Sequence, residues 1–245
     1  MDRFGRGYAW PHRGRPLLAR DRNRRGEHAE RNINLARVGL GDRRYQPTLA
    51  EHEQDRGEET GCARGGNRLI NIESRRFILR PLTPDDVDED YIGWWNDTDI
   101  QAGLNSLPRN WERFHALRHV RRFNNRDRFH LGLFRKDGPL IGFLALFLDD
   151  KLKIARANIV IGNKKYWGKR VPEEVVPALV EYLFTQTSSV KLKLETISSN
   201  RSSIASMKRC GAKQEGVLRE EKENPYGERL DVCLFSILKS EWQSN

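Results

Sequence analysis

The residues best placed to do chemistry in this 245-residue sequence lie in a basic loop between an apolar strand and a helix. The β-branched run from Ile159 to Ile161 predicts a strand, and a helix is expected to begin near Pro172. Four cations stand in the loop between them: Lys164, Lys165, Lys169 and Arg170. Gly168 would let the backbone approach a ligand closely. Because the first N–H groups of a helix lack intrahelical partners and lie at the positive end of its dipole, this pattern predicts a phosphate or pyrophosphate site.

An ordinary strand–turn–helix with a solvated basic turn would show the same pattern, because exposed lysines are common. Two well-known phosphate-binding patterns do not occur: there is no G-x-x-x-x-G-K-[ST], and no G-x-G-x-x-G follows a strand. Both interpretations therefore stay open on this stretch alone.

Four segments in a fixed order carry further motifs. They are FILRPLTPDD at 77–86, KYWGKR at 165–170, NRSSIASMKRCGAKQEGVLR at 200–219 and DVCLFSILKSEW at 231–242. Together they resemble the Gcn5-related N-acetyltransferase (GNAT) family, and within it the branch of the RimJ and RimL ribosomal-protein acetyltransferases. The segment 165–170 is similar to the family's acetyl-coenzyme A loop, [Q/R]-x-x-G-x-[G/A], which follows the fourth strand.

The resemblance implies an α/β fold with a mixed, mostly antiparallel central sheet of about six or seven strands, flanked by about four helices. It implies direct transfer of an acetyl group from acetyl-coenzyme A to a primary amine in a ternary complex. The family parts two central strands so that the pantetheine arm can pair with backbone groups. The cofactor-binding residues implied here are Ile159, Val160, Ile161, Lys165, Tyr166, Trp167, Gly168, Lys169, Arg170, Val171, Asn200 and Ser203. Asn200 also suits a plain helix N-cap, and both roles could hold together.

The sequence departs from the family pattern at several points. Arg170 replaces Gly or Ala, Lys165 replaces Gln or Arg, and Pro177 inside the helix is expected to kink it. The family's general-acid Tyr falls at Met207, and no Glu stands in the fourth strand. A thiol with a pKa near 8.5 can leave without much help, so this loss need not abolish turnover.

The general base is left unassigned by the sequence. Glu195 and Asp231 are weak candidates acting through water, as are Asp149 and Asp150, although each would serve equally as a surface or turn carboxylate. An α-amino group with a pKa near 8 needs little base catalysis, whereas a lysine near 10.4 needs more. The acceptor is therefore expected to be a protein N-terminus, an amino sugar or another small amine rather than a lysine.

The chain divides into two parts by composition. Residues 1–67 contain 14 Arg, no Lys and no Ser, and we expect them to form a disordered extension, with the acetyltransferase domain at 68–245. Arg13-Gly14-Arg15-Pro16 is the core of an AT-hook, residues 30–37 faintly resemble an insertion-sequence transposase, and a transit peptide or a segment without a role are further alternatives. If the domain were a degenerate, non-catalytic binding module, this tail would be the part that contacts nucleic acid.

Composition also restricts location and partners. The longest apolar run, 140–148, is too short to cross a membrane and fits a buried strand. Cys62, Cys210 and Cys233 form no disulfide or zinc pattern, so we expect a cytoplasmic protein with no metal, as a monomer or homodimer. The net charge of +10 favours anionic partners without specifying them.

The periodicity predicts the remaining elements. Strands are expected at 77–79, 129–134, 140–148, 154–161, 190–197, 214–221 and 229–238. Helices are expected from Pro84, with a core stripe at Tyr91, Ile92, Trp94 and Trp95, and at 105–125, 172–187 and 200–210. His115 and His119 form an i, i+4 pair on the second of these, for which a solvated face is expected and metal binding is the alternative.

Overall fold

The structure is a computed structural model that describes residues 70–242, all within the second of the two units into which the chain divides, 47–245. The predictions for the segment 1–67 lie outside the described residues. These include its boundary, the Arg13–Pro16 tetrapeptide, the segment 30–37 and Cys62.

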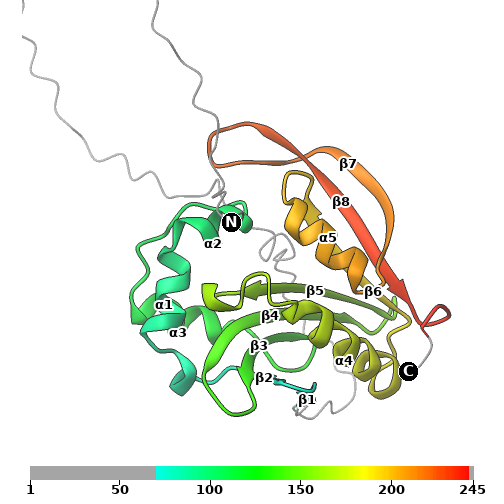
Figure 1. Ribbon diagram of the computed structural model, residues 1–245, viewed down its shortest axis with the longest axis horizontal. Helices are drawn as coiled ribbons and strands as arrows, with labels where there is room; N and C mark the ends of the chain where they lie inside the picture. The colour runs from blue at the N-terminus through cyan, green and yellow to red at the C-terminus, as the bar shows by residue number, and fades with distance from the viewer. Residues whose placement is uncertain (1–69, 243–245) are drawn as a thin grey trace, which may run out of the picture. The chain divides into compact units, whose positions relative to one another are not determined.

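An eight-stranded sheet forms the centre of the described residues (Figure 1). Its order is β1-β2-β3-β4-β5-β6-β8-β7, and every neighbouring pair is antiparallel except β5 and β6. The strands are β1 (Ile72–Glu73), β2 (Phe77–Pro81), β3 (Arg128–Arg135), β4 (Leu140–Asp149), β5 (Ile154–Ile161), β6 (Lys191–Ile197), β7 (Lys213–Glu223) and β8 (Arg229–Leu238). The predicted mixed, mostly antiparallel α/β sheet is confirmed. The eighth strand is the two-residue β1.

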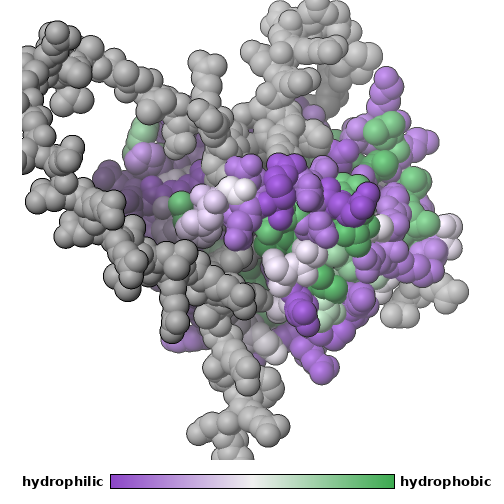
Figure 2. Space-filling view, turned by 90° about the horizontal axis from the view of Figure 1, so that it is seen from above, coloured by the Kyte–Doolittle hydropathy of each residue, from purple (hydrophilic) through white to green (hydrophobic). Residues whose placement is uncertain are grey.

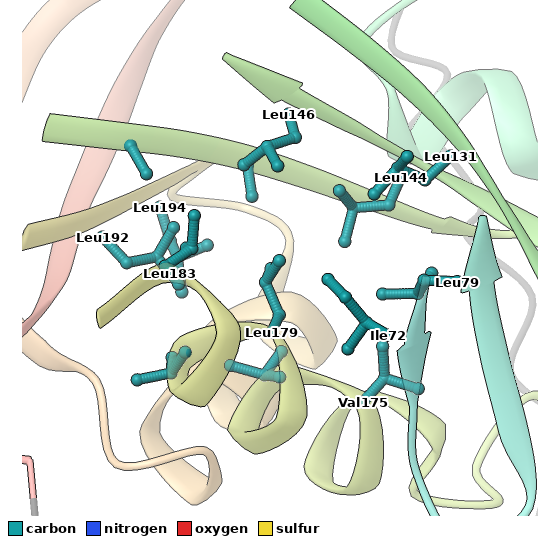
Figure 3. Packing of buried hydrophobic residues seen from close by; sticks show 14 of the residues in the cluster. Ile72, Leu79, Leu131, Leu144, Leu146, Val175, Leu179, Leu183, Leu192 and Leu194 are labelled. Atoms are coloured by element: carbon teal, nitrogen blue, oxygen red, sulfur yellow. The ribbon is translucent and has the colours of Figure 1, made fainter. Parts of the chain in front are cut away.

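Helices cover the two faces of the sheet and enclose two separate cores. They are α1 (Glu89–Asn96), α2 (Thr98–Gly103), α3 (Arg113–Val120), α4 (Val171–Gln186) and α5 (Arg201–Arg209), with short 3₁₀ turns η1 (Pro84–Asp86) and η2 (Lys164–Tyr166). The larger core lies between the sheet and α4, whose Val175, Leu179 and Leu183 face strand residues such as Leu144 and Leu192 (Figure 3). On the opposite face, Phe143 and Val160 pack against the aromatic residues of α1 and against α3.

The helix α4 is the element that carries the basic loop at its N-terminal end. It runs unbroken through Pro177, so this proline does not end the helix. Glu174 in its first turn accepts hydrogen bonds from the Ser74 hydroxyl (3.2 Å) and from Nε of Arg76 (2.7 Å). Glu173 pairs with Arg209 of α5. The start of α4 is thereby fixed to β1–β2 and to α5.

The predicted helix at 105–125 is wrong over most of its length. Only residues 113–120 are helical, as α3. Asn105 and Asn110 adopt positive φ angles of 54° and 50°, and Trp111 forms two backbone hydrogen bonds with the side chain of Asn96, 2.6 and 2.9 Å long. These contacts with α1 hold the segment before α3 in a non-helical path.

The expected helix from Pro84 is also divided. Pro84–Asp86 forms a single 3₁₀ turn, because the Asp86 carboxylate is held by Arg80 and by the backbone N–H of Thr83. The helix proper begins at Glu89, where Asp88 caps it by accepting the N–H of Tyr91 at 2.8 Å. The predicted core stripe is confirmed: Tyr91, Ile92, Trp94 and Trp95 are all buried.

The part of the surface that Figure 2 shows in colour is mainly hydrophilic, with smaller hydrophobic areas between the hydrophilic residues. Cys210 and Cys233 are buried free thiols. Within residues 70–242, no helix combines the length and apolar character needed to cross a bilayer.

Candidate functional site

The strands β5 and β6 are paired over only part of their length. The register joins Ile154 to Lys191, Ala155 to Leu192 and Arg156 to Lys193, and no pairing continues beyond Arg156. On its other side, β5 pairs with β4 over its whole length, up to Ile161 opposite Gly142. The two central strands therefore part after Arg156, as the family resemblance predicts.

The alternation of the strand decides which backbone groups face this parting. The Val190 N–H donates to the carbonyl of Lys153 (2.8 Å) on the β6 side, whereas the Gly162 N–H donates to Ile141 (3.0 Å) on the β4 side. Because successive residues direct their N–H and C=O groups to opposite edges, the odd-numbered residues of β5 face the parting. Ile159 and Ile161 present backbone groups there, whereas those of Val160 are directed to β4.

The loop after β5 turns sharply back toward the strand. Asn163 opens η2 by accepting the Lys165 N–H at 3.1 Å, and the indole Nε1 of Trp167 donates to the carbonyl of Ile161 at 2.7 Å. Gly168 has a φ of 72°, in the left-handed region where glycine is strain-free. This path places residues 167–170 directly before the first turn of α4.

The cations of the loop separate into two kinds. Lys164 Nζ lies 2.7 Å from both Asp97 and Asp99 at the start of α2, and these hydrogen bonds raise the pKa of Lys164. Lys165, Lys169 and Arg170 are exposed, and over the part of the chain that the structure describes they form no ion pair. Lys164 thus links the loop to α2 through two ion pairs, while the other three cations can bind an anion at the start of α4.

Arg170, which replaces the Gly or Ala of the motif that this loop resembles, has an unusual backbone conformation. It caps α4 with φ 55° and ψ 36°, in the left-handed region. An L-residue with a Cβ carries roughly 1–2 kcal/mol of strain in this region.

This strain leads to a stability prediction. Arg170→Gly is expected to leave the free energy of unfolding unchanged or to raise it by up to about 1 kcal/mol, because lost strain outweighs the flexibility of glycine. Lys169→Gly, one residue earlier and without a positive φ, should lower it by roughly 0.5–1 kcal/mol. Urea unfolding measures both, and equal destabilisation by the two changes would contradict the assignment of strain to Arg170.

The start of α5 lies close to α2. The side-chain oxygen Oδ1 of Asn200 accepts the Ser203 N–H at 3.0 Å, which confirms the predicted N-cap, and its side-chain nitrogen Nδ2 donates to the Gly103 carbonyl at 3.4 Å. Met207, at the position of the family's general-acid Tyr, packs against the larger core. Asn200 follows the end of β6, the second of the two strands that part.

Two of the four carboxylates predicted as weak base candidates lie on β6 and β8, and both have structural partners. Glu195 lies 2.9 Å from Lys222 Nζ, and Asp231 accepts the Glu220 N–H at 2.9 Å. In place of a family Glu, β5 has Arg156 and Asn158. The described residues place no carboxylate on β5.

A pair of neighbouring histidines, the buried His130 and the half-buried His119, was missed by the sequence reasoning. His119 does not lie on a solvated face: its ring packs 4.7 Å from that of Trp95 and 5.1 Å from that of His130. His130 Nε2 lies 2.9 Å from the Tyr91 hydroxyl. Burial lowers the pKa of His119 to about 3, and it lowers that of His130 well below its usual value. The signal was available, since His130 interrupts the apolar run of a buried strand and His119 continues the stripe of Ala116, Val120 and Phe123.

The metal alternative for His115 and His119 receives no support, because residues 70–242 contain no group of three or more His, Cys, Asp or Glu placed to hold an ion. His115 is exposed and caps α3 through the Glu112 N–H.

Comparison with known proteins agrees with the acetyltransferase resemblance of the sequence motifs. Residues 76–213 match the family described as the Acetyltransferase (GNAT) domain. A curated relative from Bacillus licheniformis, described as uncharacterized N-acetyltransferase p20, is 24% identical over 180 residues, which cover 71% of this chain and 99% of the relative.

Solved structures share the fold at low sequence identity. An acetyltransferase of the GNAT family from Bacillus anthracis has a TM-score of 0.62 at 17% identity, covering 70% of this chain and 100% of its own. Spermidine N-acetyltransferase from Vibrio cholerae, solved with CoA and spermine, has a TM-score of 0.59 at 22% identity, covering 68% of this chain and 97% of its own.

Proposed function

The chain belongs to the GNAT acetyltransferase family, and on that premise we propose that it transfers an acetyl group from acetyl-coenzyme A to a primary amine. Transfer is direct, within a ternary complex of both substrates. The acceptor is a protein N-terminus, an amino sugar or another small amine. The Y-W-G-K segment at 166–169 supports a place in the RimJ- and RimL-like branch.

The observation that carries this proposal is the combination of a parted strand with a cationic helix start. Ile159 offers its N–H and C=O groups and Ile161 its N–H group, since the Ile161 carbonyl already accepts the Trp167 indole N–H. These groups suit the amide-containing pantetheine arm. The segment from Trp167 to Val171, with Lys165, Lys169 and Arg170, suits the pyrophosphate. Asn200 and Ser203 line the other side of the arm. The described residues therefore fit acetyl-coenzyme A, which supplies the activated acetyl thioester.

Val160, also predicted as a binding residue, serves this site indirectly. Its backbone is directed to β4 and its side chain is buried in the core against α1–α3. We propose that it holds β5 in place rather than contacting the cofactor.

The chemistry requires little from a general base. An α-amino group with a pKa near 8 has a neutral fraction of roughly a fifth at pH 7.4, and a thiol with a pKa near 8.5 leaves readily as the thiolate. Glu195 and Asp231 remain candidates for a general base that acts through a bridging water, because both carboxylates are bound by other groups. The non-catalytic alternative, with nucleic acid bound by the segment 1–67, has no support among the described residues.

Release of the coenzyme A thiol tests the function. We expect acetyl-coenzyme A to be consumed only when an acceptor amine is present, in a panel containing a peptide with a free N-terminus, glucosamine and spermidine. Blocking the same amines by prior acetylation should abolish the reaction. A folded protein that binds acetyl-coenzyme A but transfers to no amine in a broad panel would contradict the enzymatic proposal.

A further inference from the structure

The short helix α2 contacts the chain on both sides of the strand parting. At its start, Nζ of Lys164, in the turn that follows β5, lies 2.7 Å from the carboxylates of Asp97 and Asp99. At its end, the Gly103 carbonyl accepts Nδ2 of Asn200, which follows β6, at 3.4 Å. Because β5 and β6 are parallel and are paired only over their first residues, both contacts lie at the open end of the parting. The helix α2 therefore spans this open end.

A further contact joins the segment after α2 to the β7–β8 hairpin. Nδ2 of Asn105 donates to the Glu223 carbonyl at 3.0 Å, so α2 lies close to the end of the hairpin that joins β7 to β8 (Figure 1). Asn105 is 7% exposed with a φ of 54°, and its side-chain oxygen has no hydrogen-bond partner among the described residues. A buried oxygen without a partner is unfavourable, so the contacts around Asn105 hold it in this position.

The helix α2 is also fixed firmly on the β5 side. Ile100 is buried in the smaller core, and Nε2 of the fully buried Gln101 donates to the Trp94 carbonyl of α1 at 3.0 Å. Trp94 in turn lies against the backbone of Gly162, where a Cβ atom would come within 2.0 Å of the indole ring. The start of α2 therefore cannot shift without moving α1 or breaking the ion pairs of Lys164.

The length of α2 determines the width of the open end. Six residues of α-helix extend about 9 Å, whereas paired strands lie about 4.8 Å apart. The span is thus close to two strand spacings, which leaves room for one extended chain between β5 and β6. On the premise of the proposed function, that chain is the pantetheine arm, which pairs with the backbone of Ile159 and with the Ile161 N–H.

We propose that α2 is a positioning element for acetyl-coenzyme A, which holds the open end of the parting at the width of the pantetheine arm. Lys164 acts through its ion pairs with Asp97 and Asp99 and not as a ligand of the phosphates. Asn105 acts at the other end of α2 by holding the hairpin side in place. Unpaired backbone groups at a strand edge favour pairing, so without α2 the two strands would tend to pair beyond Arg156 and close the cofactor site.

Removal of the two acids distinguishes positioning from direct phosphate binding. If Lys164 bound the phosphates, Asp97→Asn with Asp99→Asn would release it and remove two negative charges near the anion, so affinity for acetyl-coenzyme A would rise. If α2 positions the site, this double variant weakens binding, as does Lys164→Gln. Asparagine at 97 keeps the N-cap of α2. In calorimetric titrations of the full-length protein we expect both to raise the Kd roughly tenfold, because the site must then be ordered on binding.

Two further variants serve as controls for this pair. Glu89→Gln with Asp90→Asn removes the same charge from exposed positions on the neighbouring helix α1, and should leave the Kd unchanged. Lys164→Arg keeps a cation between the two carboxylates and should keep wild-type binding. Urea unfolding of each variant shows whether it is folded before its binding is compared.

Release of the other end of α2 is an independent test. Asn105→Gly tolerates the positive φ but removes the hydrogen bond to Glu223, and we expect it to raise the Kd by a similar factor. Because Lys164→Gln and Asn105→Gly release the same helix, their effects should not multiply in the double variant. Two independent local effects would multiply.

The inference is overturned if the Asp97→Asn, Asp99→Asn variant binds acetyl-coenzyme A as tightly as the wild type or more tightly, or if the effects of Lys164→Gln and Asn105→Gly multiply. In either case, wild-type binding would leave the proposed function in place. A folded wild-type protein that binds no acetyl-coenzyme A would contradict the proposed function itself, and with it the positioning role of α2.

Discussion

Gly168→Asp should reduce the affinity for acetyl-coenzyme A by at least about 100-fold, roughly 3 kcal/mol, while Gly168→Asn keeps most of it. Gly168 has a φ of 72°, and no heavy atom lies within 4 Å of a Cβ built on it, so a side chain has room. Asn and Asp both tolerate the left-handed region. The two variants therefore differ chiefly in charge. An aspartate there would offset Lys165, Lys169 and Arg170 and would repel the phosphates.

Gly211 supplies a matched control for this experiment. It has a φ of 84°, with no heavy atom within 4 Å of a Cβ, and it follows the C-terminal end of α5, where Arg209 contacts Glu173 of α4 rather than the loop cations. Gly211→Asp should leave binding unchanged in a calorimetric titration. If Gly168→Asn weakened binding as much as Gly168→Asp, backbone conformation rather than phosphate recognition would explain the loss.

The second large effect is a loss of stability in mild acid. His119 has a pKa near 3 because of burial and of repulsion by Arg122 and Arg109, and burial with repulsion by His119 also lowers that of His130. Unfolded histidine has a pKa near 6.5, so below that pH the unfolded chain takes up two protons that the folded chain does not. The stabilisation is complete above pH 6.5 and is lost as the pH falls toward the folded values.

The expected size follows from this linkage. Between pH 7.5 and pH 5, His119 should lower the free energy of unfolding by about 2 kcal/mol, and His130 should lower it by up to about the same amount. Carboxylates with lowered pKa values, such as Asp86, Asp97 and Glu174, lose their contribution to the free energy of unfolding mainly below pH 5. The interval from pH 5 to pH 7.5 therefore isolates the buried histidines.

Urea unfolding of the full-length protein at the two pH values measures this loss. His119→Phe should remove about half of the pH dependence, because the phenyl ring cannot take up a proton. His115→Phe, at an exposed position on the same helix, should leave it unchanged. Equal stability at pH 5 and 7.5, or equal effects of the two variants, would show that the buried pair does not control the acid response.

The sequence predicted the bounds of an element correctly where one local pattern determines that element. The β-branched residues of β5, bounded by the turn after Asp149, predicted its limits at 154–161, and the apolar run of β4 was predicted to within one residue. The segment before α3 failed because its path depends on the contact between Asn96 and Trp111, 15 residues apart, which overrides the helical spacing. Such a tertiary contact leaves no periodic signal in the sequence.

The candidate site was likewise predictable where a local motif determines it, and not where it depends on contacts between distant segments. Motif resemblance predicted the strand, the loop and Asn200, and the parting of β5 and β6 lies beside them. Contacts between distant segments were not predictable. Lys164 bonds Asp99 across 65 residues, and the opposition of Arg156 and Lys193 depends on the register of two strands separated by α4. Residue types alone therefore indicated the cofactor loop but not the tertiary contacts around it.

Calorimetric titration of acetyl-coenzyme A into the full-length protein tests the central claim most directly. The parted strand and the three exposed cations before α4 predict saturable binding with a micromolar Kd, unchanged by Gly211→Asp and lost in Gly168→Asp. A protein that is folded by circular dichroism yet gives no saturable heat with acetyl-coenzyme A would contradict the assignment of this loop and strand as an acetyl-coenzyme A site.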